Sequence, residues 1–269
     1  MLGLVLVSLL GVALIVNLVD DDDDETVSAE ANRTEDGTSA SDFIDAGAGD
    51  DSVFALAGDD IVFAGEGDDR AFGAGGEDIL IGEDGNDFLR GGDQGDLLYG
   101  GAGEDTLLGD AGDDLLDGTD IVDAVGLVEA AEQAALTGTF LTDAQLASFV
   151  DFDGDPGEAD VLSGGAGDDE IFAGNNDIVD TGGGQDAVLL GAWIDGATGP
   201  DVSETPVIDR FDPAQDAIVY FYEGATLPVV SWSEEDDGGN LLIDGEVVAQ
   251  FTNSNFSGLV NETIEFVQI

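Results

Sequence analysis

The chain has 269 residues and is strongly acidic, with 62 Asp and Glu against four Lys and Arg and a formal net charge of −58. A charge of that sign and size excludes binding to nucleic acid and to anionic lipid headgroups. The sequence contains no Cys, which excludes disulfides and thiol chemistry, and no His, which removes the usual acid–base catalyst and zinc ligand.

The N-terminal region combines an apolar run with an acidic stretch. Residues 2–19, which begin at Leu2 and end at Val19, are just long enough to cross a bilayer as a helix. No Lys or Arg precedes this run, and no small-residue cleavage site follows it. The sequence leaves open an uncleaved membrane anchor, an atypical export signal and a packed core helix, so we treat 1–19 as an anchor or signal-like segment. Residues 20–41 lack periodicity and are predicted to form a disordered acidic spacer.

Residues 46–117 consist of eight consecutive nine-residue units without an insertion. The sixth position is Asp in every unit, the eighth is Val, Ala or Leu, and the fourth is Gly in all units but one. A degenerate unit at 37–45 precedes them in phase, and the phase returns at 160–190, where one unit is a residue short. The Asp residues of this position are the candidate metal ligands: Asp42, Asp51, Asp60, Asp69, Asp78, Asp87, Asp96, Asp105, Asp114, Asp160, Asp169, Asp177 and Asp186.

The chemistry of one unit predicts its structure. The glycines permit the positive φ angles of a tight turn, and the last three residues suit a short strand whose middle side chain points inward. Two units then close one coil, so that Asp residues two units apart stack along each edge at a strand spacing of roughly 4.8 Å. Like charges at that spacing repel and raise the carboxylate pKa. A cation is therefore needed between them, because four basic residues cannot neutralise 62 acids.

Calcium is the cation that this set of donors favours. Carboxylates and turn carbonyls are hard oxygen ligands, which suit Ca²⁺ better than zinc or copper, and the strict octahedral demand of Mg²⁺ disfavours it. The apolar core alone is too small, since one aliphatic side chain per unit contributes about 1.5–3 kcal/mol. Ordering nine residues costs on the order of 9–18 kcal/mol of backbone entropy. We therefore expect calcium binding and folding to be one event.

Two units meet the pattern G-G-x-G-x-D-x-U-x at every fixed position, namely Gly-Gly-Ala-Gly-Glu-Asp-Thr-Leu-Leu at 100–108 and Gly-Gly-Ala-Gly-Asp-Asp-Glu-Ile-Phe at 164–172. The chain thereby resembles the RTX, or haemolysin-type calcium-binding, family. The resemblance implies a mainly β fold, a right-handed parallel β-roll or β-helix solenoid at 42–118 that continues at 160–190. It also implies export by a type I secretion machinery, and the apolar tail 263–269 is similar to the C-terminal signals of such exported proteins. The resemblance is weak in the C-terminal region and absent from residues 1–41.

The strand positions that point outward differ between alternate units. One set is mixed and includes Ser52, Phe54, Arg70 and Thr106. The other set is almost entirely apolar: Ile61, Phe63, Ile79, Ile81, Leu97, Tyr99 and Leu115. Because a long apolar stripe is disfavoured in water, we expect the second face to be covered, by the helical insertion or the C-terminal region in preference to a second molecule.

Between and after the repeats the pattern changes. Residues 119–159 are predicted to be a helical insertion, with an alanine-rich helix from 124 and a capping box at 142–145 that opens a second helix. The following loop at 151–155 resembles the start of an EF-hand, but Pro156 and Leu162 replace its turn glycine and closing glutamate. Residues 191–269 are predicted to form a β-rich cap and secretion region, with strands at 207–211, 217–222, 228–232, 240–243 and 247–251 and a hairpin turn at 244–245.

These features favour a binding function over catalysis. The sequence has no HExxH or G-x-S-x-G motif, so we expect no enzyme activity and no catalytic residues, although two-carboxylate glycosidase chemistry remains open by residue type. The leading hypothesis is a secreted or surface-displayed protein that binds several Ca²⁺ ions and whose folding is coupled to extracellular calcium. The alternatives are a calcium-stabilised adhesion or surface-layer component and, with less support, an enzyme carrying RTX repeats. The expected partners are calcium ions, the type I export machinery and a membrane contacted through residues 2–19.

Overall fold

The computed structural model describes residues 32–119, 126, 159–191, 205–222, 226–235, 238–252 and 264–268. The apolar run at 2–19, residues 120–125 and 127–158 of the helical insertion and the loop at 151–155 lie outside these residues. The predicted acidic spacer is described from residue 32 on, and there Thr34–Asp36 form a strand instead of disordered chain. Within the part of the chain that is described, no helix has the length and apolar character that a membrane crossing requires.

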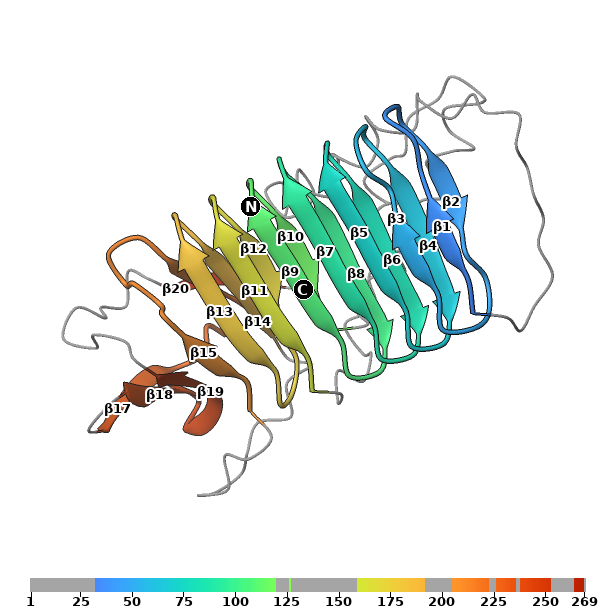
Figure 1. Ribbon diagram of the computed structural model, residues 1–269. Helices are drawn as coiled ribbons and strands as arrows, with labels where there is room; N and C mark the ends of the chain where they lie inside the picture. The colour runs from blue at the N-terminus through green and yellow to red at the C-terminus, as the bar shows by residue number, and fades with distance from the viewer. Residues whose placement is uncertain are drawn as a thin grey trace.

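The chain alternates between two stacked β-sheets (Figure 1). Sheet A contains, in spatial order, β1 (Thr34–Asp36), β3 (Ser52–Phe54), β5 (Arg70–Gly75), β7 (Phe88–Asp93), β9 (Thr106–Ala111), β11 (Val161–Ala166), β13 (Ile178–Gly183), β15 (Val207–Asp209), β19 (Glu246–Thr252), β18 (Gly238–Ile243) and β17 (Val230–Glu235). Sheet B contains β2 (Phe43–Asp45), β4 (Ile61–Glu66), β6 (Ile79–Asp84), β8 (Leu97–Ala102), β10 (Leu115–Asp117), β12 (Glu170–Phe172), β14 (Ala187–Gly191), β16 (Ala217–Tyr222) and β20 (Ile264–Gln268).

The register of the sheets confirms that two units form one coil. Parallel neighbours such as Ile61 and Ile79, or Ile79 and Leu97, are the same position of units two apart. The repeats that follow the insertion rejoin the same sheets, because Val161 pairs directly with Thr106. The described repeats therefore form one continuous parallel β-roll, as the sequence predicts.

The core of the roll is a narrow line of inward side chains, one from the eighth position of each unit. Val62, Leu80 and Leu98 are fully buried in sheet B, and Leu89 and Leu107 are fully buried in sheet A. This inner line has one apolar side chain per strand, as the repeat predicts, and its burial alone stabilises each coil only modestly.

The apolar outer face of sheet B is buried, as expected. Ile79 is 0% exposed and Leu97 is 9% exposed, whereas the corresponding face of sheet A leaves Phe54 36% exposed and Arg70 exposed. This burial confirms that the apolar face is covered. The assignment of the cover to the helical insertion or to the C-terminal region stays a prediction.

The C-terminal strands extend the roll. β15 and β16 pair in parallel with β13 and β14, and β17–β19 form an antiparallel extension joined to β15 through β19 (Figure 1). The expected hairpin turn is present at Asp244 and Gly245, whose φ angles are 53° and 92°. The tail that resembles a secretion signal forms β20, which pairs in parallel with β16 and so belongs to sheet B.

Candidate metal sites

The sixth-position Asp of each unit lies in the turn just before a strand. Its backbone carbonyl accepts a hydrogen bond from the strand one coil further on, as Asp60 does from the Ile79 N–H at 2.8 Å. Its backbone N–H donates to the carboxylate of the equivalent Asp in the next coil, as Asp60 does to Oδ1 of Asp78 at 2.8 Å and Asp78 to Oδ1 of Asp96 at 2.9 Å. The carboxylates are therefore built into the stacking of the coils, and the side chains lie inside the turns instead of in solvent.

These contacts produce two carboxylate rows. The first row contains Asp51, Asp69, Asp87, Asp105, Asp160 and Asp177. The second row contains Asp42, Asp60, Asp78, Asp96, Asp114, Asp169, Asp186 and Asp216. The structure thus brings every candidate ligand predicted from the sequence into one of two rows, and it adds Asp216.

Asp216 was missed because it lies 30 residues after Asp186, outside the repeat phase. The signal that could have found it is the Asp-x-Ile spacing of Asp216 and Ile218, since Ile218 occupies the inward position that pairs with Val188.

One oxygen of most of these carboxylates has no hydrogen-bond donor among the described residues. The atom is Oδ2, and it is buried in Asp51, Asp60, Asp69, Asp78, Asp87, Asp96, Asp114, Asp169 and Asp186. Burying a carboxylate oxygen without a partner costs free energy of folding. A cation offsets this cost best, because it balances the charge and replaces the lost water.

The first glycine of a unit forms a cradle beside this oxygen. A Cβ added to Gly73 would lie 2.2 Å from Oδ2 of Asp78. A Cβ added to Gly82 would lie 2.3 Å from both Oδ2 of Asp87 and the carbonyl oxygen of Gly100. A carboxylate oxygen and a main-chain carbonyl of the next coil therefore face the same small space, which glycine leaves open.

Burial makes these carboxylates weaker acids than an exposed Asp. It raises the pKa of Asp96 to about 8, of Asp78 and Asp87 to about 7, and of Asp60 to about 6. Backbone hydrogen bonds oppose the rise, and neighbouring carboxylates add to it. The sequence predicts that repulsion between like charges raises the pKa. The structure corrects this, because loss of hydration is the larger cause of the rise.

The donors fit calcium. Within the described residues, no group of three or more acidic side chains gathers at one point, so an ion in a row requires backbone carbonyls as well as carboxylates. That mixture of hard oxygens is the ligand set of Ca²⁺, which takes six to eight oxygens in flexible geometry. The residues that would hold the ions are the Asp carboxylates with unpartnered Oδ2 and the carbonyls of the neighbouring glycine turns.

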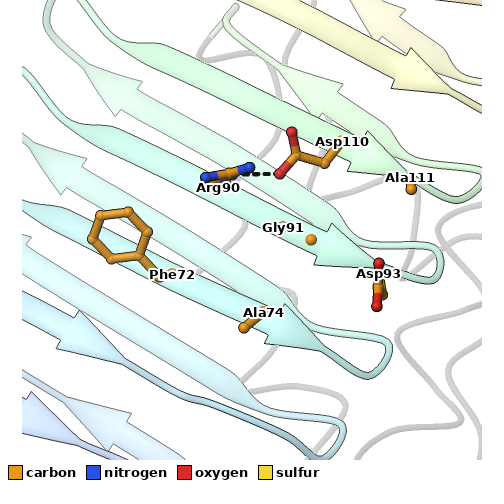
Figure 2. Close-up of a pocket in the computed structure, with 8 residues that line it drawn as sticks. Phe72, Ala74, Arg90, Gly91, Asp93, Asp110 and Ala111 are labelled. Atoms are coloured by element: carbon orange, nitrogen blue, oxygen red, sulfur yellow. Dashed lines mark hydrogen bonds and ion pairs between the residues drawn. The ribbon is translucent and has the colours of Figure 1, made fainter.

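A shallow pocket on sheet A lies apart from these ligands (Figure 2). It is lined by Phe72, Ala74, Arg90, Gly91, Gly92, Asp93, Asp110 and Ala111. An ion pair joins Arg90 to Asp110 across it, and the ring of Phe72 stacks on Phe54 with centroids 5.0 Å apart. None of the Asp residues of the two carboxylate rows lines this pocket.

Stacked coils, glycine turns and two buried carboxylate rows define a parallel β-roll of the calcium-binding repeat class. The family described as the RTX calcium-binding nonapeptide repeat (4 copies) matches the chain at residues 36–71, 63–98, 72–107, 90–120 and 157–188. Residues 36–120 and 157–188 therefore carry RTX calcium-binding nonapeptide repeats.

No curated protein matches the chain in sequence. Among solved structures, it is similar to the extracellular lipase LipA from Serratia marcescens, with 15% sequence identity and a TM-score of 0.28. The match covers 79% of this chain and 40% of the lipase chain, so this protein spans less than half of the length of that relative.

Proposed function

We propose that this protein is a secreted or surface-displayed RTX protein whose folding is coupled to the binding of several extracellular Ca²⁺ ions. The observation that carries the proposal is the buried, unpartnered Oδ2 that recurs along both carboxylate rows. Without a cation, folding has to bury these oxygens unpaired. With calcium, the same oxygens become ligands, and the ion supplies the stabilisation that the narrow core lacks.

The charge of the chain supports a role outside the cell. Self-repulsion at a net charge of −58 keeps the metal-free chain open, a form suited to a narrow export channel. Extracellular calcium modules typically bind at about 10⁻⁴–10⁻³ M, far above cytosolic calcium. Export by a type I machinery is the route that the family resemblance implies. Membrane contact through residues 2–19 belongs to the surface-displayed form of the proposal.

The proposed role is not enzymatic. A chain without His or Cys lacks the side chains most used for general acid–base and nucleophilic catalysis. The Asp residues of the rows are committed to the stacking of the coils, because their backbone and side chain both bond to neighbouring turns.

The exposed face of sheet A favours one second candidate, a calcium-stabilised adhesion or surface-layer component. Phe54 and Phe72 stack there with rings nearly parallel, and exposed Arg70 forms no ion pair with a described residue. Aromatic rings beside an unpaired guanidinium are the groups that binding surfaces enrich. In this version the ordered roll presents sheet A to a partner.

Limited proteolysis of the full chain tests the proposal. We expect calcium to protect the repeats at 42–118 and 160–190 from cleavage, and equal magnesium to leave them as sensitive as in chelator. Equal protection in all three conditions would contradict calcium-coupled folding. Fractionation of producing cells separates the two versions, since a released protein is recovered in filtered medium and a displayed one with the membranes.

A further inference from the structure

Three carboxylates at the ends of the rows differ from those inside. Oδ1 of Asp177 accepts from the Asp160 N–H at 3.0 Å, and its Oδ2 accepts from the Gly174 N–H at 2.6 Å. Asp177 ends the first row, because the residue before the next strand of sheet A is Pro206, which has neither a carboxylate nor an N–H. Both carboxylate oxygens of the last Asp in this row therefore accept a hydrogen bond.

Asp216 ends the second row in the same way. Its Oδ1 accepts from the Asp186 N–H at 3.2 Å, and its Oδ2 accepts from the Asp212 N–H at 2.7 Å and the Thr181 hydroxyl at 3.5 Å. At the opposite end of this row, Oδ2 of Asp42 accepts from the Thr38 N–H. None of these three residues shares the unpartnered, buried Oδ2 of the interior carboxylates.

The local sequence explains the difference. In each case the donor lies three or four residues before the Asp, in a turn that departs from the full glycine repeat. The unit with Asp177 is one residue short, which tightens its turn and brings Gly174 onto the carboxylate. Before Asp216 the turn is closed by the Gln215 and Asp216 N–H groups, which both donate to the Asp212 carbonyl.

We propose that Asp177 at the end of the first row, and Asp42 and Asp216 at the two ends of the second row, are metal-free caps, so that calcium binds at the other carboxylates of the rows and not at these three. This inference rests on the proposed calcium binding. An N–H group directs the positive end of its dipole at the oxygen it contacts, and a cation cannot approach along the same direction. Both carboxylate oxygens of Asp177 and Asp216 thus accept hydrogen bonds, whereas interior carboxylates such as Asp87 and Asp96 each keep an oxygen for an ion, as does Asp51 at the uncapped start of the first row.

Counting bound calcium in variants of the full chain tests the caps. Equilibrium dialysis at saturating calcium gives the ion number for Asp177→Asn and Asp216→Asn, with Asp87→Asn and Asp96→Asn as matched interior variants of the same two rows. We expect each interior variant to lose at least one ion and each cap variant to keep the full number. A cap variant that loses an ion as the interior variants do would overturn the inference.

A second measurement covers variants that fold poorly. The dependence of the unfolding midpoint on the logarithm of calcium concentration reports the ions released on unfolding. This slope should be unchanged in Asp42→Asn, Asp177→Asn and Asp216→Asn, even where the midpoint falls, and should decrease in Asp96→Asn. Asp42 is only half-buried in the first coil, so its variant is the least disruptive. If the unmodified chain binds no calcium, the proposed function fails; if it binds calcium and the caps contribute ions, only this inference fails.

Discussion

At the scale of single residues, the first glycine of a unit has a role that can be tested separately from the Asp. Gly82→Ala places a methyl group against Oδ2 of Asp87 and the Gly100 carbonyl, whereas Gly75→Ala meets nothing within 4 Å. Overpacking of this kind costs about 1–3 kcal/mol. We expect Gly82→Ala to raise the calcium concentration at the folding midpoint. The rise is about tenfold if ~1.4 kcal/mol falls on the binding of one ion, and smaller if several ions bind in the same transition. Calcium titration of both variants checks this. Equal midpoints would show that the space left open by the first glycine does not contribute to calcium binding.

At the scale of elements, the two sheets present outer faces with opposite requirements. Ile79→Lys puts a charge on the buried outer face of sheet B, and Thr106→Lys puts the same charge on the partly exposed face of sheet A. Burying an unpaired charge is among the largest single destabilisations, so we expect a loss of about 3 kcal/mol or more for Ile79→Lys and within about 0.5 kcal/mol for Thr106→Lys. Denaturant unfolding in saturating calcium measures both. Similar losses would contradict a covered face.

The elements also show what the sequence could and could not predict. The stacking of Asp60 on Asp78 followed from the nine-residue period, because equal spacing forces equal positions into register. The bonding of Asp177 to Gly174 did not follow, since a one-residue deletion changes a turn in a way that period alone does not specify. Asp216 was missed for a related reason: a long connection separates it from the repeats, and only the three-dimensional pairing of β14 with β16 restores the alignment.

At the scale of the whole molecule, the buried rows make stability depend on pH with a definite sign. Burial raises the pKa of Asp60 to about 6 and that of Asp96 to about 8 in the metal-free fold, above the ordinary 3.8, so these carboxylates bind more protons in the folded form than in the unfolded chain. The stability that they contribute is therefore greatest below pH 3.8 and is lost as the pH rises to about 8. Calcium needs the ionised carboxylates, so its binding displaces protons.

This linkage gives opposite expectations with and without the ion. As the pH falls from about 8 to about 6, we expect the metal-free chain to gain β-structure. Over the same range, we expect the calcium concentration at the folding midpoint to rise by up to about tenfold per pH unit for each proton that one ion displaces. Circular dichroism at several pH values measures both effects. A calcium midpoint that does not change over this range would contradict protonated carboxylates in the metal-free rows.

If calcium binding and folding of the roll are one event, far-UV circular dichroism of the full chain during a calcium titration will record both as a single transition. The titration starts in chelator-cleared buffer at neutral pH, with magnesium as the control. We expect a cooperative change from coil to β-structure at about 10⁻⁴–10⁻³ M calcium and no such change with magnesium. A complete β spectrum before calcium is added would contradict this expectation, because the carboxylate rows would then be stabilised without the ion.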